Sequence, residues 1–284
     1  MAITNFIPTV WGEALHQTMN RQLIGVSNCT REYEGDITEK GSVVKICGLQ
    51  NVAIRDYVKN TDMELPESLT DFSTELKIDH AKYFNFQIDD VDRAQATPHL
   101  MELAMQNAAS RLASEADRAV FNLYDQATLK AEIHYAEACE ILKKLVDART
   151  KLYENGVTNN DDVVIEVTPK IASLILKQKI DLVPNANLLE NGCIGSLFGC
   201  KIYVSNNIHS GYWYEVNADM IVHKCIMRTK RAVAFASQLS EIQAYRPELR
   251  FADAVKGLYL FGCKIVRPDE FLKLEFTCDP TFIE

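Results

Sequence analysis

Apolar residues recur at intervals of three and four in three stretches of the sequence, and this spacing predicts amphipathic helices. The first stretch covers residues 10–24, the longest runs from about 97 to 126, and the third from about 135 to 154. A Thr-Pro pair suits the start of the long helix, and an Asn-Gly pair suits the end of the third. At 1.5 Å per residue the long helix would span roughly 45 Å, so we expect it to act as a strut.

Two other stretches, residues 33–57 and 74–90, are rich in β-branched and aromatic residues and predict strands. A polar, acidic connection that contains Pro66 joins them. A two-stranded ribbon of this kind is marginal in water, because no third strand or helix covers its apolar side. The first predicted helix likewise has no helical partner nearby in the sequence. We therefore expect neighbouring copies of the chain to cover both segments.

The rest of the chain mixes short helices and strands. Residues 162–167 predict a buried strand, and a Thr-Pro pair caps a short helix after it. A glycine cluster at 192–199 indicates turns before a strand at 200–206, and 219–226 predicts a further strand. The C-terminal part is rich in strands. The order shows no regular alternation of strand and helix, so the sequence predicts an α+β fold.

Composition narrows the class of protein. The chain has 284 residues, of which 47% are hydrophobic and 24% charged, and these values are typical of a soluble globular protein with about two domains. The net charge of -9 argues against binding to nucleic-acid backbones. We find no signal peptide and no run of about 18 apolar residues, so we expect a cytoplasmic, unanchored protein. The eight cysteines form no CxxC pair.

Charge is distributed unevenly along the chain. Residues 33–75 contain nine acidic and four basic residues (net -5), whereas residues 224–268 contain nine basic and three acidic ones (net +6). Opposed charge on two elements favours docking between them, within one chain or between copies. The alternative is that both are solvated faces, as charge runs usually are.

Motifs of catalysis and cofactor binding are absent: the sequence contains no GxxxxGK[ST], GxGxxG after a strand, HExxH or GxSxG. Asp89, Asp90 and Asp92 are candidates for a divalent cation, but the EF-hand glycine and terminal glutamate are missing. A solvated strand end explains them more simply. A soluble metal-dependent enzyme that uses Asp90, Asp92 and a histidine stays open as an alternative, as does a monomeric binding module.

Four strings, taken in order, resemble the major capsid protein of tailed phages, whose fold encapsulins share. FIPTVWGEAL followed by REYEGDITEKGSVVKICGL resembles its N-terminal arm and the start of its extended E-loop. LYENGVTNNDDVVIEVTPKIASLIL resembles the beginning of its A-domain, and AYRPELRFADAVKGLYLFGCKIVRP resembles its C-terminal strands. The resemblance covers nearly the whole chain, and the order of the strings is more specific than any one of them.

The resemblance implies an α+β phage major capsid protein fold in four parts. These are an N-terminal arm (1–32), a β-hairpin E-loop (33–75), a P-domain (76–155 and 233–263) with a spine helix at about 97–126, and an A-domain (156–232 and 264–284). It also implies a structural subunit without catalysis, cofactor or metal. Copies would form the hexamers and pentamers of an icosahedral head around double-stranded DNA.

The resemblance also implies where the protein acts and what it meets. We expect assembly in the host cytoplasm, location in the virion, non-specific contact with packaged DNA and no membrane contact. Portal, scaffolding and decoration proteins are the other implied partners. Because the arm starts within ten residues of Met1, we expect a separate scaffolding protein or none. An encapsulin-type compartment that loads a protein cargo is the nearest alternative.

In this family the arm and the E-loop lie across neighbouring subunits, which predicts the residues that make subunit contacts. We expect these contacts to involve Trp11, Leu15, Tyr33, Arg55, Tyr57, Glu64, Glu67, Asp71, Arg246, Arg250 and Arg267. A narrower hypothesis concerns charge. The acidic residues near the tip of the ribbon, Glu64, Glu67 and Asp71, would meet a basic surface of a neighbouring subunit, for which the three arginines are candidates.

Overall fold

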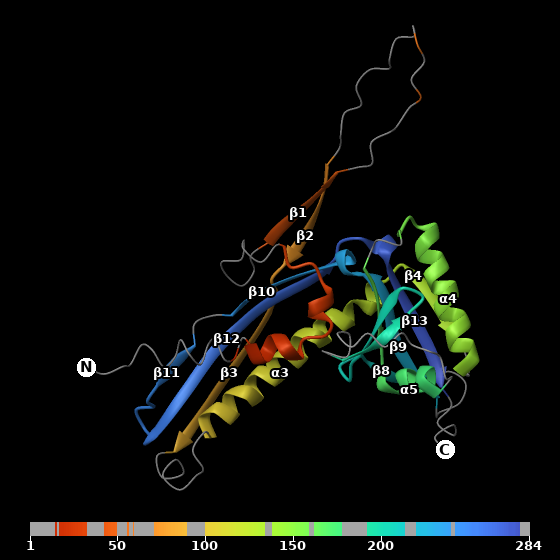
Figure 1. Ribbon diagram of the computed structural model, residues 1–284. Helices are drawn as coiled ribbons and strands as arrows, with labels where there is room; N and C mark the ends of the chain where they lie inside the picture. The colour runs from red at the N-terminus through yellow and green to blue at the C-terminus, as the bar shows by residue number, and fades with distance from the viewer. Residues whose placement is uncertain are drawn as a thin grey trace.

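The computed structural model of the chain contains two large sheets, the helices that cover them and one projecting hairpin (Figure 1). It describes residues 15, 17–32, 43–49, 56, 59, 71–89, 100–133, 138–158, 162–177, 192–213, 220–239 and 242–278. Helices and sheets follow one another without a repeated strand-helix-strand order, which confirms the α+β prediction.

The first large sheet, the long sheet, is built around one strand of 14 residues, β12 (Ala252–Ile265). On one side β12 pairs antiparallel with β3 (His80–Asp89), and on the other with β10 (Val233–Leu239) and β11 (Gln243–Tyr245). Side chains alternate along β3, so that Phe84 and Phe86 face the apolar cluster beneath the sheet while their neighbours face solvent.

Helix α3 (Leu100–Asn122) runs along the long sheet (Figure 1). Its buried side is a stripe of small and medium apolar residues, which lets the helix approach the strands closely. These residues are Met105, Ala109, Leu112, Ala113, Ala116 and Val120. The helix ends in a 3₁₀ turn, η3 (Leu123–Gln126), so the predicted helix is correct in place, and its predicted first turn lies outside the described residues.

The second large sheet has seven strands, with the path β4-β13-β9-β5-β7-β6 and β8 added to β9. Two of its pairings, β4 with β13 and β5 with β7, are parallel. The bounds of its strands are β4 (Leu129–Ile133), β5 (Val163–Val167), β6 (Cys193–Leu197), β7 (Cys200–Val204), β8 (Ser210–Trp213), β9 (Met220–Thr229) and β13 (Phe271–Cys278).

Two helices, α4 (Ala138–Glu154) and α5 (Pro169–Lys177), pack on one face of the seven-stranded sheet. Both carry apolar residues at helical spacing, and these join alternate residues of the strands in a single buried cluster. None of the described helices combines the length and the apolar composition needed to cross a lipid bilayer.

The hairpin pairs β1 (Val43–Leu49) with β2 (Asp71–Lys77) in antiparallel register. The apolar side of its described base packs against residues of the same chain. Val44, Ile46, Leu76 and Ile78 pack against Ala234, Ala236 and Leu260 of the long sheet. The expectation that only other copies cover the ribbon is therefore wrong for its described base, because the outer face of β10 and β12 supplies the cover.

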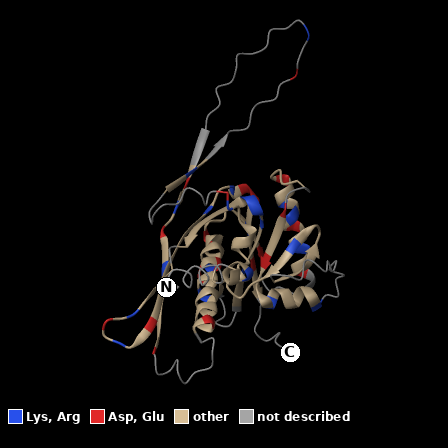
Figure 2. Ribbon diagram, turned by 60° about the vertical axis from the view of Figure 1, so that its left-hand side comes forward, with Lys and Arg blue, Asp and Glu red and all other residues tan. Residues whose placement is uncertain are grey.

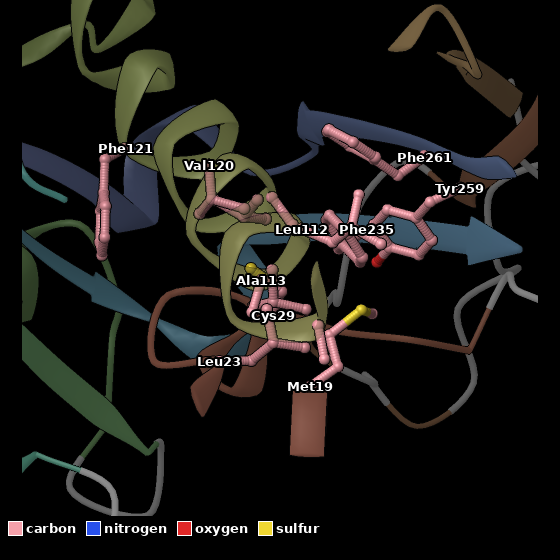
Figure 3. Close-up of a cluster of buried hydrophobic side chains, with 14 of the residues drawn as sticks. Met19, Leu23, Cys29, Leu112, Ala113, Val120, Phe121, Phe235, Tyr259 and Phe261 are labelled. Atoms are coloured by element: carbon pink, nitrogen blue, oxygen red, sulfur yellow. The ribbon is translucent and has the colours of Figure 1, made fainter. Parts of the chain in front are cut away.

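The described part of the N-terminal helix, residues 17–22, also lies on its own chain. Leu15, Met19 and Leu23 are almost fully buried in the same cluster as Leu112 of α3, as Figure 3 shows for Met19 and Leu23. The prediction that neighbouring copies hide this helix is wrong for these residues. Their partner is α3. Because α3 follows about 90 residues later, the sequence around the N-terminal helix does not indicate this contact.

Short elements account for the remaining differences from the sequence predictions. Strands β4 and β8 were not predicted, and the expected turns at 192–199 are the short strand β6 with its hairpin turn to β7. The predicted single strand over 74–90 is two strands, β2 and β3, with a break at Ile78–Asp79. Three further 3₁₀ turns are η1 (Val26–Asn28), η4 (Lys230–Ala232) and η5 (Pro268–Glu270).

Candidate assembly surfaces

The turn between β11 and β12, residues 246–251, carries the most exposed large apolar side chains of the described part of the chain. Leu249 is 97% exposed and Phe251 is 83% exposed. This turn, which we name the tip, lies at the end of the long sheet that points away from the seven-stranded sheet (Figure 1). Two adjoining apolar side chains held in water are typical of a protein-binding surface rather than of a solvated turn.

A second exposed group follows the face of the long sheet opposite α3. Tyr83 is 78% exposed and lies directly across from Leu258 in the β3–β12 pairing. Two residues further along, the Tyr245 hydroxyl donates a 3.0 Å hydrogen bond to Asn85 Oδ1, and the Lys256 ammonium lies 5.2 Å from the Tyr245 ring centre. We name these five residues the strip. It combines aromatic rings with a few polar groups, as interface cores do.

The three arginines that are candidates for the basic surface lie at two separate places in the fold. Arg246 and Arg250 belong to the tip, whereas Arg267 follows the other end of β12. At about 3.4 Å per residue, the 14 residues of β12 separate the two sites by roughly 45 Å. Arg246 Nε lies 3.7 Å from Asp253 Oδ1.

Arg267 has a partner in its own chain, because its Nη1 donates a 3.1 Å hydrogen bond to Glu270. Glu270 also accepts hydrogen bonds from Arg231 and Thr229. Burial opposes ionisation of Glu270, but these donors, Arg231 first, outweigh it and hold the pKa of the carboxyl below its usual value. Arg267 is thus part of an intramolecular cluster at the end of β9.

The other predicted contact residues divide into two groups. Leu15 is buried against α3, and Asp71 pairs with Leu49 at the outer end of the described hairpin. The rest lie outside the described residues: Trp11, Tyr33, Arg55, Tyr57, Glu64 and Glu67, together with the candidate metal ligands Asp90 and Asp92. Within the described ranges no group of three or more His, Cys, Asp or Glu side chains is placed to hold a metal ion.

A cavity of about 410 Å³ opens beside α3, where β2 leads into β3. Lys82 Nζ lies 2.8 Å from Glu115 Oε2, and Arg118 Nη1 donates to Glu115 Oε1 at 3.0 Å. The hydrogen bond from Lys82 is the main reason that the pKa of Glu115 is lowered. Both cations in this cavity therefore bind the same carboxylate, and Asp79 adds a second carboxylate to the lining. The His80 ring, which also lines the cavity, is stacked on Phe261.

The sequence did not predict the exposed apolar residues of the tip and the strip as contacts. These residues are Leu249, Phe251, Tyr83 and Leu258. A signal for the tip was present: Leu249 and Phe251 stand in a turn that follows Pro247 and is otherwise charged. Apolar residues in such a turn have no local core to enter. The signal for Tyr83 and Leu258 was weaker, because exposed residues on one face of a strand alternate in the same way as buried ones.

Comparison with solved structures shows the same architecture over most of the chain. A chain from Mycobacterium phage Che8 superimposes with a TM-score of 0.68 at 24% identity and covers 89% of this chain and 91% of that chain. A chain of the capsid of Ralstonia phage GP4 gives a TM-score of 0.66 at 12% identity and covers 92% and 91%. The chain therefore has the fold of phage capsid proteins.

The capsid fold is not confined to phages. A chain of the virus-like particle from Pyrococcus furiosus superimposes with a TM-score of 0.57 at 13% identity and covers 92% of this chain and 96% of that chain. By sequence, no protein-family model and no curated protein matches this chain. The capsid fold is thus visible in three dimensions although sequence identity to these structures is low.

Proposed function

We propose that this protein is the major capsid protein of a tailed phage, a structural subunit that assembles with itself into the icosahedral shell around double-stranded DNA. The observation that carries the proposal is the capsid fold, which extends over about nine-tenths of this chain and of its structural neighbours. The tip and the strip support it, because a subunit of a shell must keep apolar surface available for other copies.

The proposal assigns a part to each segment of the fold. Residues 1–32 are the N-terminal arm and 33–75 the E-loop, and the long sheet with α3 is the P-domain. We place β4 and α4 with the A-domain, since β4 pairs with β13 and α4 packs in the cluster of the seven-stranded sheet. The P-domain then comprises about 76–126 and 233–263, and the A-domain 127–232 and 264–284.

Within the shell, we propose that the tip and the strip bury apolar area against sister subunits. Obligate interfaces of about 2,000–5,000 Å² supply enough hydrophobic free energy to exceed the ordering cost of association. Each contact need not be strong, because a closed shell multiplies it over many copies. Trp11, Tyr33, Arg55 and Tyr57 remain proposed contacts of the arm and E-loop.

We keep the charge hypothesis for two regions, the acidic end of the E-loop and the arginines of the tip. The acidic residues Glu64, Glu67 and Asp71 would meet Arg246 and Arg250 of a neighbour, whereas Arg267 is held by Glu270 in its own chain. Changing the three acids to Lys should lower the yield of particles and weaken its dependence on salt. An unchanged yield and an unchanged salt dependence would remove this contact from the proposal.

Imaging of the purified chain tests the proposed function directly. We expect negative-stain images to show closed hollow particles, and light scattering to give a mass of many subunits. Discrete particles of about 32 kDa, the mass of one chain, would overturn the proposal and favour a monomeric binding module. A deletion of residues 50–72 should abolish regular particles while the remaining subunit stays folded.

The contents of the particles distinguish a phage head from a compartment that holds a protein cargo. Particles isolated from cells that carry the gene in its native genome should contain nuclease-resistant double-stranded DNA. Portal and scaffolding partners, if the proposal is correct, should appear in the same preparations. A single protein cargo in stoichiometric amount, without DNA, would favour the encapsulin-type alternative.

A further inference from the structure

Residues 23–30, which we name the clasp, join the N-terminal helix to both large sheets. At one end, Thr30 donates its backbone N–H to Val233 O at 2.9 Å and accepts the Phe235 N–H at 3.0 Å, which ties it to β10. The preceding residues contact α3, β5 and β9 through buried polar groups. The clasp therefore contacts β10 of the long sheet, β9 of the seven-stranded sheet and α3.

One arginine binds the clasp to the seven-stranded sheet. Arg228 on β9 is fully buried and uses all five of its N–H groups. It donates two hydrogen bonds to the Glu166 carboxylate, at 2.9 and 3.0 Å, and the other three to the clasp. The acceptors in the clasp are Gly25 O at 2.9 Å, Asn28 O at 2.7 Å and Cys29 Sγ at 3.5 Å.

One carboxylate binds the clasp to α3. Asp117 is fully buried and accepts the backbone N–H of Ile24 at 2.9 Å and that of Val26 at 3.1 Å. A Cβ at Gly25 would lie 2.9 Å from the Phe121 ring, so the clasp backbone sits directly on the helix. This close approach keeps bulk water away from Asp117.

The charges in this buried region do not balance. Asp117 and Glu166 are two carboxylates, whereas Arg228 is one guanidinium, and all three side chains are 0% exposed. The Cys29 thiol adds no positive charge, and burial raises its pKa to about 11. The charges of these three buried side chains therefore sum to -1 among the described residues, an arrangement that favours uptake of a proton.

We propose that the clasp is a proton-controlled latch: protonation of Asp117 holds residues 23–30 closed on α3, and ionisation of Asp117 favours their release. The geometry makes Asp117 the switching group. Glu166 is paired with Arg228, whereas Asp117 is held by backbone N–H groups of the clasp, which carry no net charge. A protonated Asp117 still accepts a hydrogen bond at its carbonyl oxygen, so closure survives the uptake of the proton.

The direction of the pH effect follows from the environment of Asp117. Burial, with a smaller contribution from Glu166, raises the pKa of Asp117 from 3.8 to about 6 against the hydrogen bonds from the clasp. Opening of the clasp would hydrate the carboxyl and return its pKa toward the usual value. Protonation therefore stabilises the closed latch fully only below the usual pKa of 3.8, and this stabilisation is lost progressively as the pH rises from there through about 6.

Hydrogen exchange on the assembled, full-length protein tests the latch. After correction for intrinsic exchange, the opening constant of the Ile24 and Val26 amides should rise by about 10-fold between pH 5 and pH 8, because only about one unit of the interval between the two pKa values lies above pH 5. Asp117→Asn should make the opening constant independent of pH. Glu166→Gln should shift the midpoint to lower pH, because it removes the neighbouring negative charge.

A matched control lies on the same helix. Glu115→Gln removes a partly exposed carboxylate two residues from Asp117 and should leave both the midpoint and the amplitude unchanged. A flat pH profile in the unaltered protein would overturn the proposal, as would an unchanged profile in Asp117→Asn. If Asp117→Asn does not fold, the unaltered profile and the Glu166→Gln shift still decide the question.

Discussion

At the scale of single residues, a glycine determines how the hairpin joins the long sheet. A Cβ at Gly262 of β12 would lie 2.2 Å from Lys77 O and 3.1 Å from Ile78 Cδ1. The chain between β2 and β3 therefore crosses β12 at this position in backbone contact. Because a backbone carbonyl cannot move aside as the end of a flexible side chain can, only glycine fits.

We expect Gly262→Ala to destabilise the fold by about 3 kcal/mol, the upper part of the range for overpacking, because the new methyl group would overlap main-chain atoms. Thermal unfolding of the purified protein measures the loss. Gly156→Ala is the matched control: this glycine has φ 90° but no neighbour within 4 Å, so only backbone strain of about 1 kcal/mol should appear. Equal effects of the two variants would contradict the contact argument.

The buried Arg228–Glu166 pair leads to a second prediction at this scale. Arg228→Met should lower the free energy of unfolding by about 3–5 kcal/mol, because it leaves Glu166 and the clasp carbonyls buried without donors. The double variant with Glu166→Met should be less unstable than the sum of the single variants. Denaturant unfolding of dissociated subunits provides all three values, and simple additivity would show that the pair is not coupled.

At the scale of elements, apolar spacing predicted α3, α4 and the C-terminal strands within a few residues, because each is long enough for its period to show. The break between β2 and β3 could not be predicted in this way. Alternation continues through Leu76, Ile78 and Phe84 although the first two face the hairpin cluster and the third faces α3. A period of two records which face is buried but not which partner buries it.

The sequence could have indicated that Glu166 and Arg228 are buried charged residues, but it could not indicate which groups they contact. Glu166 interrupts an otherwise apolar strand, and Arg228 lies in another, so each signals a paired charge inside the fold. Their connection to Asp117 and the clasp depends on segments more than 60 residues apart. Such contacts follow from the packing of the whole chain and leave no local pattern.

The N-terminal helix provides a prediction for an element. Met19→Ala should destabilise the protein by about 2–4 kcal/mol, because the buried side chain leaves a cavity against α3. Asn20→Ala, on the exposed side of the same turn, should change the free energy of unfolding by less than about 0.5 kcal/mol. Urea denaturation checks both. If Met19→Ala were as mild as its neighbour, α3 would not be the main cover of this helix.

At the scale of the whole molecule, charge and apolar surface are arranged differently. Lys and Arg are interspersed with Asp and Glu over both large sheets, as Figure 2 shows for the described residues. Five of the eleven exposed large apolar side chains of the described residues, in contrast, belong to the tip and the strip, and these five include the three most exposed ones. Mixed charge keeps a free subunit soluble, so we expect assembly to depend on these apolar groups more than on any single ion pair.

Because these side chains are exposed in the free subunit, changing them should affect assembly but not folding. A variant of the tip tests this expectation. Leu249→Asp together with Phe251→Asp should leave the unfolding temperature of the subunit nearly unchanged, since both side chains are already in water. The same variant should reduce the yield of closed particles at least tenfold in negative-stain images and light scattering, because it puts charges where apolar area must be buried between copies. Leu176→Asp, an exposed leucine on α5, is the control that should still assemble. Full assembly of the tip variant would mean that Leu249 and Phe251 stay in solvent within the shell, and the contact between subunits would then have to lie elsewhere on the long sheet.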